Sequence, residues 1–91
     1  MLNALERATI AEHVSDYIIE HLLIEEPMRS NALARLAREI TKDKISDPED
    51  FETVAKLAVE TLQLDPRTFV KLRGERLPWV YHKEWPQHHE G

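Results

Sequence analysis

Residues 68–85 read TFVKLRGERLPWVYHKEW, and this stretch decides which class of fold the chain can adopt. Thr68 to Leu72 alternates in polarity and is rich in β-branched and aromatic residues, which is typical of a strand. Gly74 is the only glycine before the last residue, so it marks a tight turn. Leu77 to Trp85 then resumes the β pattern, and the sequence predicts a β-hairpin.

Pro78 interrupts the second half of this hairpin. Proline has no N–H to donate to a sheet ladder, so we expect the second strand to lie at an edge. A two-stranded hairpin is only marginally stable in water by itself. The hairpin therefore needs a helical surface beneath its apolar side chains.

The first helical segment extends from about Leu2 to Glu26, and Pro27 is expected to end it because a residue before proline is pushed out of helical geometry. Its core-facing stripe comprises Ile10, Val14, Tyr17, Ile18 and His21. A second stripe comprises Leu5, Ile19 and Leu23. A helix that faces one core needs only one stripe, so the second is predicted to pack against the C-terminal segment or a second copy of the chain.

Two further helices follow. One is expected to begin at an N-cap on Ser30 or Asn31 and to end near 42–44, with Leu33, Leu36, Ala37 and Ile40 inward. The next begins at Asp47-Pro48, where Asp47 can cap and proline suits the first helical position. It ends at 64–66, with Phe51, Val54, Leu57, Ala58 and Leu62 inward.

A length of 91 residues allows one domain. We expect a single domain over residues 1–86, mainly α-helical with a C-terminal β-hairpin, and a flexible tail over 87–91. Three helices followed by a hairpin is the element order of a winged-helix domain. The alternative is a helical bundle whose irregular C-terminal extension docks as an arm on a neighbouring molecule.

The pattern over about Ile10 to Pro86 resembles the amino-terminal winged-helix domain of the bacterial RNA polymerase delta subunit and its helix-turn-helix relatives. The resemblance rests on the three amphipathic helices, the Leu64-Asp65 exit into the first strand, and the strand with Trp79 and a late Trp85-Pro86. It implies an accessory protein of transcription rather than an enzyme.

The net charge of −5 argues against a uniformly basic nucleic-acid coat, but the charge is banded along the chain. Residues 1–26 hold six acids and one Arg, and residues 45–64 hold five acids and one Lys. Residues 27–44 hold five cations and two acids. The candidate nucleic-acid contacts are the cations of the second helix and of the hairpin, namely Arg29, Arg35, Arg38, Lys42, Lys71, Arg73 and Arg76. The alternative is that these cations are solvated or paired with Glu39 or the first helix.

The third helix is a poor candidate for insertion into the major groove of DNA. Its exposed face is predicted to carry Glu52, Thr53, Lys56, Glu60 and Gln63, which is unfavourable beside phosphates. Trp79, Tyr81 and Trp85 follow i, i+2, i+6 spacing along the second strand and are expected to share one side. They either cover the helical core or form an exposed anchor for a partner, because Trp and Tyr dominate interface hot spots.

No catalytic, cofactor or metal residues are predicted. The chain has no Cys, two Gly and no glycine-rich loop, and its adjacent histidines His88-His89 fall in the expected tail. No secretory signal or apolar run of membrane-spanning length is present, so we expect a cytoplasmic protein that does not contact a membrane.

Two functions remain open from the sequence. The favoured one is a non-enzymatic winged-helix interaction module that docks on a protein partner in transcription or other nucleic-acid machinery and forms a homodimer. Its candidate partner contacts are Trp79, Tyr81, Trp85, Leu5, Ile19 and Leu23. The alternative is a DNA-binding regulator that uses the basic second helix and the hairpin.

Overall fold

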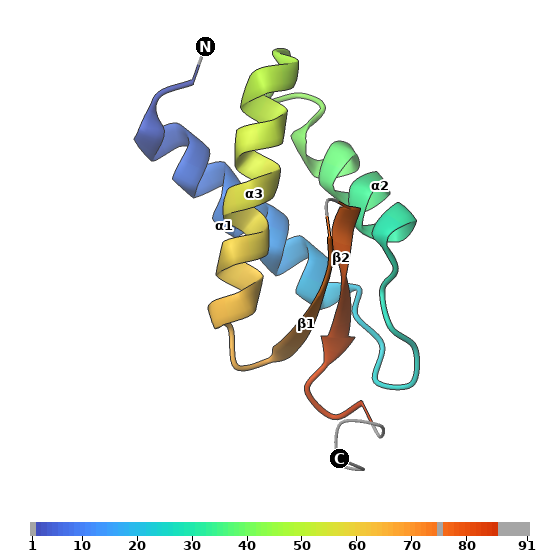
Figure 1. Cartoon of the computed structure of the whole chain (residues 1–91). Helices are drawn as coiled ribbons and strands as arrows, with labels where there is room; N and C mark the ends of the chain where they lie inside the picture. The colour runs from blue at the N-terminus through green and yellow to red at the C-terminus, as the bar shows by residue number, and fades with distance from the viewer. Residues whose placement is uncertain (1, 75, 86–91) are drawn as a thin grey trace.

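The computed structural model describes residues 2–74 and 76–85, with only the backbone of Arg76. Three helices precede two strands: α1 (Ala4–Glu20), α2 (Ser30–Thr41), α3 (Pro48–Leu64), β1 (Thr68–Arg73) and β2 (Arg76–His82). The strands pair antiparallel into the hairpin, which lies beside α2 and in front of the end of α1 (Figure 1). The predicted fold class is confirmed: mainly α-helical with a C-terminal hairpin, in a winged-helix-like order. The tail predicted at 87–91 lies outside the described residues.

The core gathers side chains from every helix and from β2. Ile18, Leu62 and Val80 are each no more than 1% exposed, and they come from α1, α3 and β2. Leu33 and Leu36 add the apolar face of α2, as predicted. The hairpin therefore closes the helical core with its inner face, which meets the need of an isolated hairpin for apolar support.

The end of α1 differs from the prediction. The helix stops at Glu20 rather than running to Glu26, so Pro27 does not terminate it. The chain leaves the helix because a long-range pairing places Met28 beside β2. The N–H of Met28 donates to the carbonyl of Val80 at 2.8 Å, and the Val80 N–H donates back at 2.9 Å. Non-local hydrogen bonds and burial of Met28 thus override the local helical pattern.

The same pairing corrects the position of β2. The prediction of an edge strand was wrong at Val80, because β1 lies on one side of β2 and Met28 on the other. Pro78 lies two residues from Val80, so its backbone nitrogen is directed to the Met28 side. The missing N–H of Pro78 therefore leaves the ladder between β1 and β2 intact.

The helix starts follow their sequence signals only in part. The Asp47 side chain caps α3 by accepting from the N–H of Glu49, as predicted. At α2 the cap was placed wrongly: Arg29 occupies the N-cap and makes no side-chain capping bond. Ser30 instead donates its hydroxyl to the carbonyl of Leu77, which ties the start of α2 to the hairpin.

A partly buried ion pair joins the start of α1 to the start of α3. Asp50 is 3% exposed and accepts from the Arg7 guanidinium at 3.1 and 3.2 Å and from the N–H of Leu2 at 3.2 Å. Burial raises the pKa of the Asp50 carboxyl, but these hydrogen bonds and the Arg7 charge outweigh burial and hold the pKa below its usual range. Asp50 is thus charged and fully engaged in holding the two helices together.

The hairpin has an inner and an outer face, but its side chains no longer alternate regularly between the two faces near the turn. Val70 packs partly against the core, whereas Leu72, which strand alternation would place on the same face, is 63% exposed. The register shifts between Lys71 and Arg73, and such an irregularity turns side chains away from their expected face. The glycine in the turn, Gly74, has a positive φ of 69°, which favours glycine over other residues.

Candidate functional site

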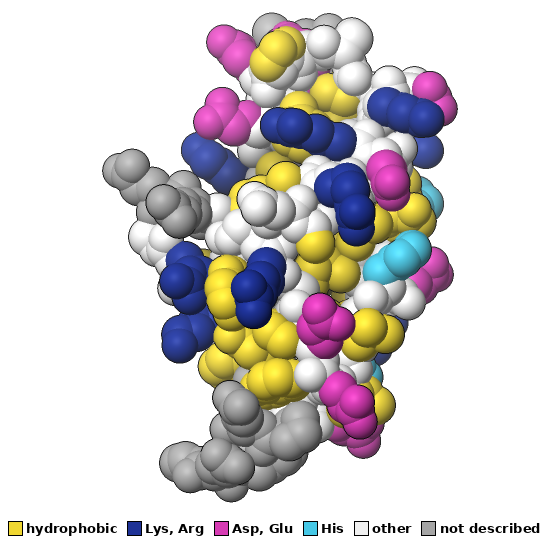
Figure 2. Space-filling view, turned by 90° about the vertical axis from the view of Figure 1, so that its right-hand side faces the viewer, with side chains coloured by type: hydrophobic (Ala, Val, Ile, Leu, Met, Phe, Trp, Pro, Cys, Tyr) yellow, Lys and Arg dark blue, Asp and Glu magenta, His cyan; other side chains and the backbone are white. Residues whose placement is uncertain are grey.

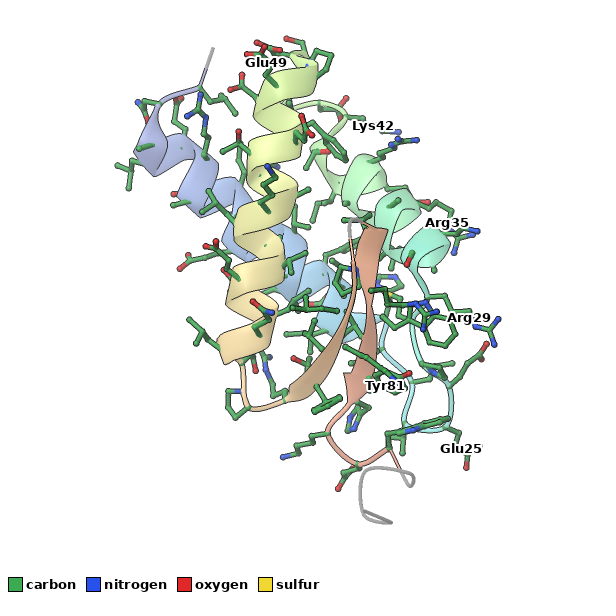
Figure 3. The ribbon with its side chains drawn as sticks, viewed as in Figure 1. Glu25, Arg29, Arg35, Lys42, Glu49 and Tyr81 are labelled. Atoms are coloured by element: carbon green, nitrogen blue, oxygen red, sulfur yellow. The ribbon has the colours of Figure 1, made fainter. Side chains whose placement is uncertain are left out.

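Exposed cations line one side of α2. Arg35, Arg38 and Lys42 are spaced by three and four residues, so they lie on neighbouring turns of the same helical surface. Figure 3 shows Arg35 and Lys42 directed outward from α2, with Arg29 just before the helix on the same side. The basic residues expected on the outer side of α2 therefore lie along one side of the folded chain, which we call the basic edge.

These cations have no carboxylate partner within the described part of the chain. The ion pairs found there join Arg7 to Asp50, and Arg67 to Asp65 and Asp16. Neither the α2 cations nor Arg73 take part in them. The expected alternative, pairing with Glu39 or with α1, is not observed among the described residues, and the positive charge of this edge is not neutralised by contact.

Arg67, unlike the cations of α2, forms ion pairs with carboxylates. Its guanidinium lies 2.7 Å from Asp65 and 3.4 Å from Asp16 of α1. The hydrogen bonds to Arg67 hold the pKa of Asp65 below its usual range and raise the pKa of Arg67. Arg67 therefore braces the turn between α3 and β1, and we assign it a structural role.

Trp79 of β2 lies beneath two guanidiniums. The Arg29 carbon Cζ is 4.9 Å from the centroid of the Trp79 ring, and Arg73 Cζ is 4.6 Å from it. The two arginines come from the chain segments on opposite sides of β2: Arg29 from the segment that holds Met28, and Arg73 from β1. Distances below about 6 Å are typical of cation–π contacts. Trp79 thus contacts two positively charged side chains.

A groove of about 450 Å³ opens at this point. Arg29, Arg73 and Trp79 form part of its wall. The remaining lining residues come from the first turns of α2 and from β2: Ser30, Asn31, Ala34 and Leu77. The groove is open to solvent rather than enclosed. Its charged groups are both positive, so it suits an anionic group.

Aromatic rings continue from Trp79 along the outer face of the hairpin. The Tyr81 ring centroid is 6.5 Å from Trp79, 5.6 Å from Trp85 and 6.1 Å from Phe69. We call these four residues the aromatic row. Trp79 and Tyr81 share the face opposite Val80, and Trp85 joins them from beyond the end of β2 rather than by strand alternation. Phe69, which pairs with Tyr81 across the strands, was not predicted as a site residue.

The basic edge and the aromatic row belong to one side of the molecule. Figure 2, which looks onto the side carrying α2, shows Lys and Arg side chains beside a broad hydrophobic area, with Asp and Glu side chains also present. In Figure 3 Tyr81 lies below Arg29, and Arg35 and Lys42 lie above it. From the sequence we predicted the cations and the aromatic residues as separate surfaces, whereas Arg29 and Arg73 join them at Trp79.

The other cations predicted as contacts contribute differently. Lys71 is exposed on β1 and pairs in register with Trp79, so it lies at the margin of the same surface. The side chain of Arg76 lies outside the described residues, and its expected contact stays a prediction. Arg38 is also partly engaged, because its Cζ lies 5.9 Å from the Phe51 ring.

The second apolar stripe on α1 is not continuous. Leu5 is 77% and Leu23 59% exposed, but Ile19 packs against the core and Leu23 lies beyond the end of the helix. The expected dimer stripe was therefore wrong as a helical surface. His21, expected to face the core, is exposed and stacks on Tyr17 with ring centroids 4.4 Å apart.

The outer face of α3 is acidic, as predicted. Glu52, Lys56, Glu60 and Gln63 are exposed, and Leu64 at the end of the helix is 86% exposed. Nothing in this face offers a basic track for phosphates. The charge contrast between α2 and α3 therefore persists on the folded surface.

Residues 2–74 and 76–85 hold neither a candidate metal site nor a membrane-spanning helix. No group of three or more His, Asp or Glu side chains gathers there in a way that could hold a metal ion. No helix in those ranges is both long and apolar enough to span a membrane.

No protein-family model matches the chain, and no curated protein or solved structure shows detectable similarity to it. We therefore infer the function from the geometry of the basic edge, the groove and the aromatic row.

Proposed function

We propose that the chain is a non-enzymatic winged-helix-like module that binds nucleic acid through α2 and the hairpin. The observation that carries the proposal is the set of exposed cations without carboxylate partners that runs from Lys42 to Arg73 in the described part of the chain. Such cations release counterions when they contact phosphates, and this release drives nucleic-acid binding. Of the two functions open from the sequence, this geometry favours nucleic-acid binding over docking on a protein.

The mode of binding differs from that of a helix-turn-helix domain with its last helix in the major groove. The exposed face of α3 carries Glu52 and Glu60, which phosphates repel. In our proposal α2 lies along the phosphate backbone and the hairpin contacts it from one end. Arg35 and Arg38 lie one turn apart on α2 and contact separate phosphates.

Fluorescence anisotropy with a labelled DNA duplex over a series of salt concentrations tests this function. The wild-type chain should bind with micromolar or better affinity near physiological salt, with a steep salt dependence. Arg35→Ala with Arg38→Ala should weaken binding and lower the salt slope by about one for each phosphate that the variant no longer neutralises. Lys56→Ala on α3 is the matched control, because it removes an exposed cation from outside the surface and should change neither quantity.

Absence of binding to duplex and single strands at low salt would overturn the proposal. In that case the aromatic row becomes a protein-docking surface, as the competing hypothesis holds. An equal loss of affinity in the Lys56→Ala control would also contradict the proposal, because it would show that net charge rather than this surface governs binding.

A role in transcription is the part of this proposal that the resemblance implies. The cytoplasmic location expected from the sequence is also kept as part of the proposal. Homodimer formation through Leu5, Ile19 and Leu23 is not favoured by their placement, since these residues do not form one surface on α1. Sedimentation of the chain with and without nucleic acid would measure its oligomeric state directly.

A further inference from the structure

We infer that the groove at Trp79, with the adjoining aromatic row, is a binding site for unpaired nucleotides, so that the chain prefers single-stranded nucleic acid to a duplex. This inference rests on the proposed function and names the form of nucleic acid that the surface recognises. The juxtaposition that carries it is Trp79 beneath Arg29 and Arg73, at the mouth of the groove.

The two guanidiniums bind a phosphate. Each guanidinium lies less than 5 Å from the Trp79 ring centroid, both line the groove, and neither has a carboxylate contact in the described part of the chain. The groove is lined by two cations and no acid, so an anion that enters it is attracted by both charges. Arginine binds phosphate oxygens through pairs of N–H donors, which makes a phosphate a fitting occupant.

The aromatic row binds the bases. Phe69 is 51% exposed, and the rings of Phe69, Trp79 and Trp85 surround Tyr81 with centroids 5.6 to 6.5 Å from its own. Bases stack on such rings only when they are unpaired, because the faces of paired bases are covered by their neighbours in a duplex. A positively charged groove combined with aromatic rings is the arrangement that proteins use for single strands.

The remaining surface fits this assignment. α2 supplies a basic edge that leads away from Trp79 and can follow the backbone of the same strand. Asn31 lines the groove and offers amide donors and acceptors toward the edge of a base. An acidic peptide would also meet the two arginines, but it would leave the aromatic row without a matching group, so a single strand fits better.

The test compares an oligothymidylate of about 12 nucleotides with a duplex of equal length, a size within the range that single-strand sites cover. At equal salt, the wild-type chain should bind the single strand at least tenfold more tightly. Trp79→Leu should lose about tenfold in affinity for the single strand, because it removes an aromatic contact and the ring that holds both arginines, and it should lose less affinity for the duplex, which cannot reach the aromatic row with its bases. Trp79→Phe should restore most of the loss.

Substitutions at two exposed residues test the site independently, in case the Trp79 variants fold poorly. Arg29→Gln and Arg73→Gln should each weaken binding of the single strand several-fold with an unchanged circular-dichroism melt, whereas Lys56→Gln should not. Fluorescence gives a direct readout: in Trp85→Phe, Trp79 is the single remaining Trp, and the oligothymidylate should quench it more than the duplex does.

The outcomes separate the inference from the proposed function. Equal or tighter binding of the duplex would overturn the inference while the proposed function stands. Competition by polyglutamate as effective as by oligothymidylate would show that the site recognises charge alone, which would also overturn it. Loss of binding to both forms of nucleic acid in the wild-type chain would remove the proposed function and the inference together.

Discussion

α2 and α3 both pack on α1 through an apolar face, but they present opposite charges to solvent and begin in different ways. α3 starts with a capping Asp47, and its third residue, the buried Asp50, forms an ion pair with Arg7. α2 starts with Arg29, which makes no capping bond and instead reaches over Trp79. The sequence of α3 is thus arranged for stability of the helix, whereas the start of α2 gives up a stabilising cap and gains a cation at the groove.

Reversing the charge of α2 should have the largest effect on binding. Arg35→Glu with Arg38→Glu replaces two phosphate contacts by repulsion, and the affinity for nucleic acid should fall by a factor on the order of 100 at low salt. Lys56→Glu with Gln63→Glu adds comparable negative charge to α3 and should change affinity by less than about threefold. Anisotropy titrations at one salt concentration measure both.

Equal losses of affinity in the α2 and α3 variants would contradict this comparison, because they would mean that the position of the added negative charge does not matter. Arg38 contacts Phe51, so a thermal melt of the α2 variant is needed to show that the core is intact.

α3 carries one buried acid that stabilises the fold, Asp50, and exposed acids that are not expected to do so. Asp50→Asn removes the charge that Arg7 pairs with, and the melting temperature should fall by about 10 °C. Glu52→Gln changes an exposed acid on the same helix and should leave the melting temperature unchanged. Circular-dichroism melts of both variants at neutral pH distinguish these results.

The pH dependence of this stability has a definite sign. The pKa of Asp50 lies below its usual value in the folded chain, so the ion pair stabilises fully above the unfolded pKa of about 3.9 and is lost as the pH falls through the folded pKa. The difference in melting temperature between wild type and Asp50→Asn should therefore narrow in strongly acidic solution. A constant difference down to low pH would exclude the ion pair as its cause.

The local signals in the sequence were sufficient for most of the fold. The cap at Asp47, the turn at Gly74 and the apolar spacing of the helices each act within a few residues, so they could be read without knowing the rest of the chain. The premature end of α1 could not be predicted, because the pairing of Met28 with Val80 joins residues far apart in sequence. The outward turn of Leu72 likewise depends on the strand register.

The candidate site was predicted as two unrelated sets of residues. Spacing placed the α2 cations on one edge and Trp79 with Tyr81 on one strand face. The meeting of Arg29 and Arg73 at Trp79 required the third chain segment beside β2, which carries no β pattern of its own. Phe69 was missed for a similar reason, since its place beside Tyr81 follows from the cross-strand register.

The smallest expected effect concerns the N-cap of α2 itself. Arg29 has the extended backbone of an N-cap, with φ of −82° and ψ of 166°, so an Asn side chain there can accept from an early N–H of the helix. Arg29→Asn should therefore stabilise the chain by about 1 kcal/mol and raise the melting temperature by about 5 °C.

The same substitution removes a guanidinium from Trp79 and should weaken single-strand binding several-fold. Arg29→Gln, which loses the charge without supplying a good cap, should weaken binding equally with no gain in stability. If Arg29→Asn raised the melting temperature and left binding unchanged, the arginine at this position would not serve the groove, and the contrast drawn between the starts of α2 and α3 would fail.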